Sequence, residues 1–266
     1  QAFKKEIFFT DLTFEFVSSF DSYLQSRGYH LNTIAKHMKH LKRYVNIAIN
    51  KEYIEIQKYA FRKYKIKTVE NKHTHLVPEE LEQLERLSLT DKHMKLQKSL
   101  DAFLFCCYAG MRYSDFTNLS KKNIVDINQE TWLIYKSVKT GTEVRLPLYL
   151  LFAGKGIVIL NKYRNNLENF FRLRDNSNIN KDLIIIAKLA GLSKKISFHT
   201  ARHTNATLLI YNGVNITTVQ KLLGHKSVKT TQVYTNIMDM TIVHDLEKIK
   251  QAALGIKKKT DNSFNK

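Results

Sequence analysis

The stretch from His199 to Tyr234 places the strongest constraint on this chain, because three polar clusters alternate there with apolar helical segments. The clusters read H-T-A-R-H from position 199, L-G-H from position 223 and T-T-Q-V-Y from position 230. Gly213 and Gly224 break the helical pattern, so we expect the clusters to lie on separate short helices that fold back on one another. Arginine and histidine bind anions and transfer protons, and a tyrosine hydroxyl can be a nucleophile. The stretch therefore predicts covalent attack on a phosphate.

The overall charge of the chain points to a polyanionic partner. Its 266 residues include 43 Lys and Arg against 24 Asp and Glu, a formal net charge of +19 with a pI near 9.7. Such a balance favours nucleic acid first and an anionic membrane surface second. With two prolines and nine glycines, the chain is expected to be mostly helical, and its length allows two domains.

The sequence contains no segment typical of membrane insertion or secretion. No run of about eighteen apolar residues occurs, and the N-terminal QAFKKEIFFT lacks the apolar core of a signal peptide. Cys106 and Cys107 adjoin in the apolar run FLFCCYAG, which predicts buried, reduced thiols. We therefore expect a cytoplasmic protein with no membrane partner.

The first 66 residues predict a small helical domain with a basic surface. Apolar residues recur at helical spacing over 12–28, and again from Asn32, where the opposite face of the helix is rich in Lys and Arg. A second basic stretch, from Lys58 to Lys72, has aromatic residues interleaved. A solvated charged face is an equally good interpretation of the basic helix face taken alone. The DNA-binding candidates are Lys36, Lys39, Lys42, Arg43, Arg62, Lys63, Lys65 and Lys67.

Residues 67–77 are expected to form an extended linker, and a new helix is expected to begin at Pro78, where proline suits the first turn. His73 and His75 could be metal ligands by residue type. No Cys or carboxylate completes a site around them, so we interpret them as linker residues and expect no metal site.

The remaining sequence alternates a buried helix, a small sheet and further helices. Residues 99–110 are apolar nearly all round, which predicts a central helix. Three short strands are expected at 123–127, 131–137 and 143–147, and Lys139 lies at the tip of the last hairpin. Helices are expected over 156–174, 180–190 and 239–253, followed by a basic mobile tail over 254–266.

Two further cationic residues could serve phosphate chemistry. Arg112 directly follows the central helix, and Lys139 lies on the hairpin. A planar guanidinium matches two phosphate oxygens, and a lysine can protonate a leaving oxygen. Each residue also has a structural interpretation, since Asp115 could pair with Arg112 and a lysine in a turn is usually only exposed. His199 and His203 are spaced as in a zinc-binding helix, but the Glu of H-E-x-x-H is missing.

Taken in order, five motifs resemble those of the tyrosine recombinase (phage integrase) family. They read A-G-M-R-Y-S-D (109–115), K-T-G (139–141), H-T-A-R-H-T (199–204), L-L-G-H (222–225) and T-T-Q-V-Y-T (230–235). The resemblance implies a mainly α fold with a small antiparallel β-sheet. An α+β catalytic domain over 78–253 would follow an all-α, SAM-like core-binding domain over 1–66, with a linker at 67–77 and a tail at 254–266.

The resemblance also implies a role for each motif residue. Arg112 and Arg202 would hold the scissile phosphate. Lys139 on the hairpin would be the general acid, and Tyr234 would be the nucleophile. His199 would be the acid/base histidine, with His203 beside it in support. His225 would contact the phosphate, and Asp115 would support the first arginine.

By resemblance, the chain would be a site-specific recombinase that forms a 3′-phosphotyrosyl intermediate without metal, ATP or another cofactor. It would act as a tetramer on double-stranded DNA attachment sites, with host bending and excision factors as further partners. The sequence H-T-A-R-H-T, together with the SAM-like N-terminal domain, is most similar to integrases of phages and conjugative transposons. Such integrases often carry an arm-binding domain upstream. The sequence lacks an initiating Met, which is compatible with removal of such a segment. Alternatives are an Xer-like resolution recombinase, a type IB topoisomerase or a non-catalytic DNA-binding protein.

Overall fold

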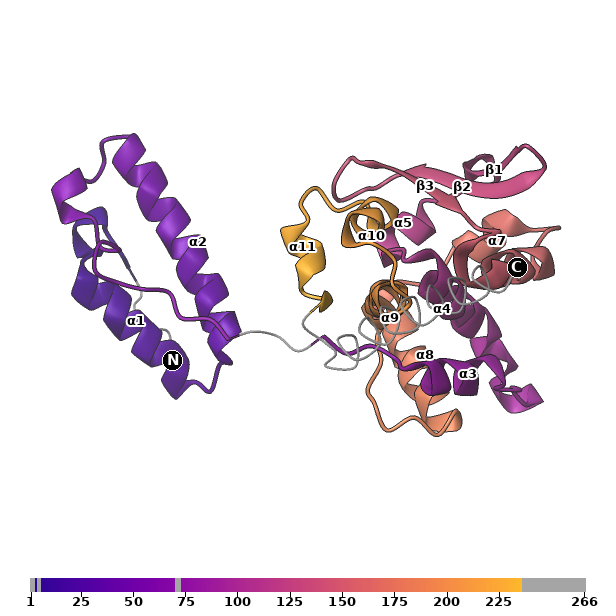
Figure 1. Cartoon of the computed structure of the whole chain (residues 1–266). Helices are drawn as coiled ribbons and strands as arrows, with labels where there is room; N and C mark the ends of the chain where they lie inside the picture. Colours follow the sequence, from indigo (N-terminus) through magenta and orange to yellow (C-terminus); the bar gives the residue numbers. More distant parts are fainter. Residues whose placement is uncertain (1–2, 4–5, 70–72, 236–266) are drawn as a thin grey trace, which may run out of the picture. The chain divides into compact units, whose positions relative to one another are not determined.

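The computed structural model describes residue 3 and residues 6–69 and 73–235. It divides into two compact units, Gln1–Lys72 and His73–Lys266, each of which is described by itself (Figure 1). Both units are built mainly of helices, and the second adds one three-stranded antiparallel sheet. The fold class expected from the sequence is confirmed. The expected helix over 239–253 and tail over 254–266 lie outside the described residues.

The first unit is a pair of helices packed side by side, α1 (Phe14–Ser26) and α2 (Leu31–Asn50) (Figure 1). The hydroxyl oxygen of Thr13 caps α1 by accepting from the Phe16 amide, and Gly28 takes the positive φ of 74° that the turn requires. Short 3-10 turns lie at Phe9–Asp11 and Ile56–Lys58. The core shared by both helices contains Val17, Leu24, Ile34, Met38, Val45, Ala60 and Phe61.

Both ends of the expected linker are attached to the units that they adjoin. Val69 exchanges two hydrogen bonds with the Asn32 side chain, which fastens this stretch to the start of α2. On the other side, Leu76 is fully buried in the core of the second unit. The stretch therefore has anchored flanks on either side of residues 70–72.

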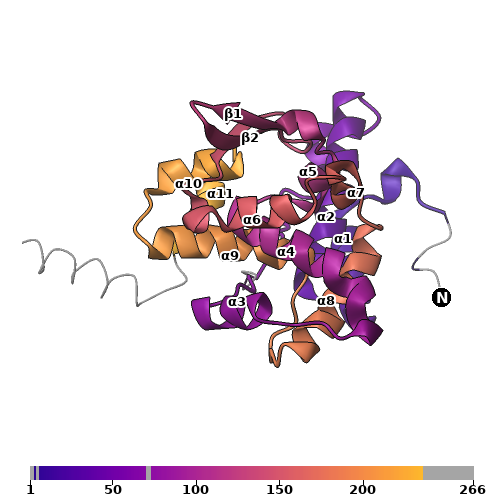
Figure 2. The ribbon, with the colours of Figure 1, turned by 90° about the vertical axis from the view of Figure 1, so that its right-hand side faces the viewer.

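The second unit is arranged around α4 (Gln97–Ala109), whose last eleven residues are all buried, as the apolar run predicted (Figure 2). Its other helices in the described residues are α3 (Pro78–Glu85), α5 (Tyr113–Thr117), α6 (Lys155–Lys162), α7 (Leu167–Phe171), α8 (Asn176–Leu189), α9 (Phe198–Tyr211), α10 (Ile216–Leu223) and α11 (Lys229–Gln232), with 3-10 turns at Asp91–Leu96, Lys121–Asn123 and Leu151–Gly154.

The single helix expected over 156–174 is wrong, because α6 ends at Lys162 and α7 begins at Leu167. The Asn166 side chain accepts a hydrogen bond from the Asn169 amide and so caps a new helix at that point. An asparagine at a helix start competes with continuation of the preceding helix. The break lets Phe170 and Phe171 pack against the central core.

The sheet consists of the three strands that the sequence predicted, with bounds that differ by one residue in the first two. Strands β1 (Ile124–Ile127), β2 (Glu130–Lys136) and β3 (Glu143–Pro147) pair antiparallel in sequence order. Helix α10 packs against β3, so one side of the sheet adjoins the polar clusters (Figure 1). The hairpin between β2 and β3 carries Lys139.

Two glycines allow the close packing on which the site depends. Gly110 ends α4 with a φ of 67°, and a Cβ there would lie 2.6 Å from Oδ1 of Asn205 on α9. Gly224 ends α10 with a φ of 62°, and a Cβ there would lie 2.6 Å from a methyl group of Val144 on β3. Only glycine accommodates both the backbone angle and the contact. The ends of α4 and α10 are thereby held against α9 and the sheet.

Among the described residues, no helix combines the length and apolar character that a membrane crossing requires.

Candidate active site

Arg202 is the most deeply placed of the expected site residues. It lies on α9 with 1% of its surface exposed, and its guanidinium donates to the Gly110 carbonyl at 2.7 Å and the Leu223 carbonyl at 2.6 Å. These carbonyls stand at the ends of α4 and α10, where helices leave carbonyl groups unpaired and carry partial negative charge. Burial and the nearby Arg112 lower the pKa of Arg202 to about 10, so it stays charged at neutral pH. The side chain is therefore a fixed cation with donors left over.

Arg112, at the start of α5, is bound to a buried carboxylate. Its Nη1 lies 3.4 Å from Asp115 Oδ2 and 3.1 Å from Ser137 Oγ. Asp115 also accepts from the Val138 amide at 2.8 Å and from the Ser137 hydroxyl at 3.3 Å. One carboxylate thus joins Arg112 to the base of the β2–β3 hairpin. The structural pairing of Arg112 with Asp115 and a phosphate-binding role are compatible, because the guanidinium has five N–H donors.

Lys139 is exposed on this hairpin, as expected. The neighbouring Thr140 hydroxyl donates to the Gly224 carbonyl at 3.2 Å. This contact ties the hairpin tip to the loop that carries His225. Lys139 is also close enough to lower the pKa of His199 and His225.

Tyr234 is buried, with 5% of its surface exposed, and its hydroxyl lies 3.1 Å from Nδ1 of His203. The rings of His225 and Tyr234 are parallel with centroids 6.5 Å apart. His225 Nδ1 lies 2.9 Å from the hydroxyl oxygen of Thr231. The candidate nucleophile Tyr234 and the two histidines therefore form one cluster.

The expectation that each of the three polar clusters lies on a short helix is only partly correct. The H-T-A-R-H cluster lies entirely within α9, whereas the other two clusters only begin on a helix: His225 follows the end of α10 and Tyr234 follows the end of α11. Gly224 turns the chain out of α10 one residue before the histidine, so that His225 is in a loop. His199, at the start of α9, is exposed and makes an edge contact with the His203 ring at 4.5 Å.

The environment keeps the histidines neutral and the tyrosine protonated. Burial, followed by the neighbouring His199 and His73, lowers the pKa of His203 to about 3, and burial followed by Arg202 and Arg112 lowers that of His225 to about 3. The His199 ring is only partly desolvated, and this effect together with the charges of Arg202 and Arg112 lowers its pKa to about 4. Burial raises the pKa of Tyr234, and the charges of Arg202 and Arg112 oppose this shift. Two cations within electrostatic range of the phenol are the condition for binding an anion beside it.

The sequence profile of the phage integrase family matches residues 74–240, and that of the phage integrase SAM-like domain matches residues 1–66. The first match alone covers more than half of the chain. The chain belongs to the phage integrase family.

Curated members of the integrase family match at moderate identity. A tyrosine recombinase of Pseudothermotoga lettingae is 30% identical over 181 residues, which cover 66% of this chain and 60% of that protein. The tyrosine recombinase XerC of Rickettsia prowazekii is 30% identical over 159 residues, 56% of this chain and 49% of that protein. The chain thus spans about half to 60% of the length of these relatives.

Solved structures of integrase-family proteins share the fold. A lambda integrase (75–356) dimer bound to a COC′ core site has a TM-score of 0.70 at 18% identity, covering 87% of this chain and 82% of that chain. The Tn1549 transposon integrase (aa 82–397) in complex with circular intermediate DNA has a TM-score of 0.63 at 16% identity, covering 84% of this chain and 80% of that chain. At such identities the likeness shows the fold alone.

Sequence reasoning missed three hydroxyl residues that hold this integrase-family site together. Ser137 bridges Arg112 and Asp115, Thr140 ties the hairpin to Gly224, and Thr231 contacts His225. Ser137 and Thr140 flank Lys139, and Thr231 lies three residues before Tyr234. Their closeness to motif residues is the only signal in the sequence, and it does not show which partner each hydroxyl contacts.

The DNA-binding candidates of the first unit are mostly available on its surface. Lys36, Lys39 and Arg43 on α2 are exposed, whereas Lys42 is half-buried. All four candidates of the second stretch, Arg62, Lys63, Lys65 and Lys67, are exposed.

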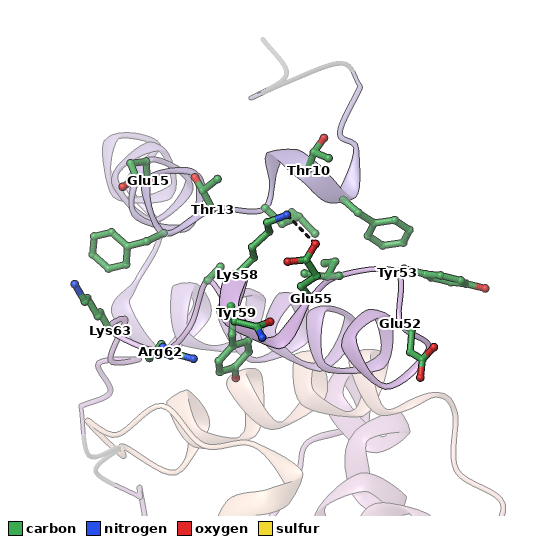
Figure 3. Close-up of a pocket in the computed structure, with 16 residues that line it drawn as sticks. Thr10, Thr13, Glu15, Glu52, Tyr53, Glu55, Lys58, Tyr59, Arg62 and Lys63 are labelled. Carbon is green, nitrogen blue, oxygen red and sulfur yellow. Dashed lines mark hydrogen bonds and ion pairs between the residues drawn. The ribbon is translucent and has the colours of Figure 1, made fainter.

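A cavity of about 650 Å³ in the first unit is lined by Arg62 and Lys63 and also by three glutamates, Glu15, Glu52 and Glu55 (Figure 3). Glu55 pairs with Lys58 at 3.1 Å inside it. Its mixed charge does not suit a polyanion. No group of three His, Cys, Asp or Glu side chains in the described parts of either unit is arranged to hold a metal ion.

Replacing Asp115 with asparagine is expected to destabilise the second unit. The Asp115 side chain is fully buried, and an amide would direct N–H groups at the donors of Arg112 or Val138. Loss of such a buried partner costs roughly 2–4 kcal/mol. Urea unfolding followed by fluorescence of Trp132, the single tryptophan, measures the change. Asp126→Asn, an exposed carboxylate on β1, is the control, and equal midpoints for both variants would contradict the assignment.

Acidification is expected to destabilise the second unit between about pH 6.5 and pH 3. In this range the unfolded chain protonates His203 and His225, which the folded state keeps neutral, so stability rises with pH. The free energy of unfolding is expected to fall between pH 7 and pH 5 by on the order of 1–2 kcal/mol per histidine. Urea unfolding at both pH values should show a smaller loss in His225→Asn. The exposed His40→Asn should match the parent, and an undiminished loss in His225→Asn would refute the assignment.

Tyr135 on β2 is expected to tolerate removal of its hydroxyl. The hydroxyl is buried without a hydrogen-bond partner among the described residues, and burial raises its pKa. Because an unpaired buried hydroxyl is unfavourable, Tyr135→Phe should leave stability unchanged or raise it by up to about 1 kcal/mol. Tyr108→Phe, which loses a 2.7 Å bond to Glu85, should lower it. Thermal unfolding compares the stability of the two variants. A clear loss of stability in Tyr135→Phe would show that the Tyr135 hydroxyl has a hydrogen-bond partner and would contradict the prediction.

Proposed function

We propose that this integrase-family chain is a site-specific DNA recombinase that cuts and rejoins strands through a 3′-phosphotyrosyl intermediate, and that it integrates or excises a mobile element. The supporting observation is the arrangement around Tyr234. Its hydroxyl contacts His203, and two arginines anchored by separate elements lie within electrostatic range. This combination supplies a nucleophile, a proton acceptor and cations for one phosphate.

In the proposed cleavage step, the Tyr234 oxygen attacks a DNA phosphorus and displaces the 5′ oxygen of the next nucleotide. Arg202 and Arg112 donate to the non-bridging oxygens, which carry the charge of the transition state. A histidine takes the tyrosine proton, and Lys139 gives a proton to the leaving oxygen. Since His203 is the histidine in contact with the hydroxyl, it is the better candidate for the first transfer, with His199 beside it.

Rejoining reverses these steps on a different strand. The 5′ hydroxyl of the partner strand attacks the phosphotyrosyl bond, Tyr234 leaves, and the number of phosphodiester bonds is unchanged. The bond energy is retained in the covalent intermediate, so the reaction needs neither nucleotide hydrolysis nor a metal ion. His225, held by Thr231, would donate to a further phosphate oxygen during both steps.

The partner that we propose is double-stranded DNA carrying paired attachment sites. Residues 1–75 contain fourteen Lys and Arg against seven Asp and Glu, a net charge of +7, which suits contacts with phosphates. Exchange between two duplexes needs four active sites, so we propose a tetramer on DNA. The lambda integrase tetramer bound to a Holliday junction, at 18% identity, has this fold. Host bending and excision factors would set the direction of the reaction.

An Xer-like role in chromosome or plasmid resolution is the second candidate. Its support is that curated relatives of this chain are named XerA, XerC and XerD. The match of residues 1–66 to the phage integrase SAM-like domain favours the mobile element. A type IB topoisomerase and a non-catalytic binding protein have no such support.

Covalent capture tests the proposal. The protein is incubated, with EDTA and without nucleotide, with nicked duplexes whose half-sites are randomised, and covalent complexes are isolated on a denaturing gel. A recovered sequence is then placed twice on a plasmid. We expect a covalent band, and deletion or inversion between the two copies. Relaxation of a plasmid lacking the sequence would instead indicate a topoisomerase, and retention without a covalent band would indicate a binding protein.

The genomic position of the recovered sequence separates the two recombinase roles. A copy beside the gene for this chain, at the edge of a mobile element, supports integration and excision. A single chromosomal copy opposite the replication origin would support resolution instead.

A further inference from the structure

The first described residue of the second unit reaches the active-site cluster. The ring of His73 stacks on the ring of His203 with centroids 4.4 Å apart and an angle of 26° between the planes. His203 contacts the Tyr234 hydroxyl through Nδ1. His199 approaches the same ring edge-on at 82°. The His203 ring therefore contacts two other histidine rings while its Nδ1 contacts the tyrosine hydroxyl.

The segment that carries His73 is fastened to α9 and its surroundings. The Leu76 amide donates to the Thr204 hydroxyl at 2.9 Å, and this hydroxyl donates to the Thr200 carbonyl. The Lys194 ammonium donates to the His75 carbonyl at 3.2 Å and to Glu80 at 2.7 Å. These contacts place residues 73–77 along α9, directly beside the motif that includes His203. The stack is thus fixed at several points.

We propose that His73 is a positioning residue for Tyr234, acting through its stack on His203. This inference rests on the proposed function, in which Tyr234 is the nucleophile. From the sequence, His73 was interpreted only as a linker residue, with no role in positioning Tyr234.

The physical basis is the orientation of one hydrogen bond. The ring of His203 can rotate about its side-chain bonds unless its faces are packed, and Nδ1 meets the Tyr234 oxygen only over a narrow range of angles. A stacked ring removes that freedom, and aromatic pairs of this geometry are favourable. Small errors in placing a nucleophile or its proton acceptor reduce the rate of the chemical step. His73 needs only a flat ring for this purpose, so phenylalanine should replace it.

Cleavage kinetics give the first test. The rate of covalent complex formation on the recovered site is measured at saturating DNA for His73→Ala, His73→Phe and the neighbouring exposed Thr74→Ala. We expect a roughly tenfold lower rate in His73→Ala, with unchanged DNA affinity. His73→Phe should restore most of the rate, and Thr74→Ala should match the parent. An unchanged rate in His73→Ala, or a loss that phenylalanine does not restore, would overturn the proposal.

An NMR measurement without DNA separates this inference from the proposed function. Tyrosine is labelled with ¹³C at Cζ, and the Tyr234 signal is assigned by its absence in Tyr234→Phe. Because this shift responds to hydrogen bonding of the hydroxyl, His73→Ala should move it, whereas His73→Phe and Thr74→Ala should not. A Tyr234 signal that stays in place in His73→Ala would refute positioning, even if cleavage occurs. Failure of all covalent capture would refute the proposed function alone.

Discussion

Tyr234→Phe is expected to abolish covalent complex formation and leave DNA binding intact. The substitution removes the only atom of this side chain that can attack phosphorus, so cleavage should fall below detection, at least about a thousandfold. The ring remains, and with it the contact to His225, so the fold should persist. Among the contacts of the described residues, the interaction lost is the 3.1 Å contact with His203, which is worth roughly 1 kcal/mol. Denaturing gels report cleavage, and native gels report binding.

Tyr108→Phe is the matched control for this experiment. Tyr108 is also buried, at 3% exposure, and its hydroxyl donates a hydrogen bond to Glu85. The Tyr108→Phe variant should be somewhat less stable than the parent and should cleave DNA at the parent rate. A covalent band that persists in Tyr234→Phe would assign the nucleophile to another residue.

Arg202→Lys is expected to reduce both cleavage and stability strongly. The guanidinium donates at once to the Gly110 and Leu223 carbonyls and still has N–H groups for a phosphate. A lysine ammonium is a single point with three donors and cannot span these positions. At least one helix-end carbonyl would lose its partner, at a cost of roughly 2–4 kcal/mol. The cleavage rate should fall by about a hundredfold or more, because phosphate binding in the transition state is lost as well.

Two measurements distinguish these effects. Urea unfolding followed by Trp132 fluorescence reports stability, and single-turnover cleavage at a temperature where the variant is folded reports the chemical step. Arg86→Lys, an exposed arginine paired with Glu82, should change neither quantity. If folded Arg202→Lys cleaved DNA at the parent rate, Arg202 would be a structural anchor and not a phosphate ligand.

The elements of the fold with strong local patterns could be predicted from the sequence. The apolar run over 99–110 predicted the buried helix α4, and the short strands expected over 131–137 and 143–147 predicted the β2–β3 hairpin. The break between α6 and α7 could not be predicted with the same means, because it depends on one asparagine cap at Asn166 that competes with an otherwise helical pattern.

The members of the candidate site could be named from motifs, but the contacts that hold them could not. Nothing local indicates that Arg202 binds carbonyls at the ends of two other helices, since these lie 92 and 21 positions away in the sequence. The same holds for His73, 130 positions before the ring on which it stacks. Such contacts follow from tertiary packing, in particular from the close approach that Gly110 and Gly224 permit. The chemical role of each residue remains a prediction.

Mass spectrometry of the covalent complex tests the central claim most directly. The complex is formed on the recovered site, the DNA is digested by nuclease, and the protein is cleaved by trypsin after Lys229. We expect the peptide that begins at Thr230 and contains Tyr234 to carry a nucleotide joined through its 3′ phosphate. A nucleotide on any other residue, or one joined through a 5′ phosphate, would contradict the proposed mechanism.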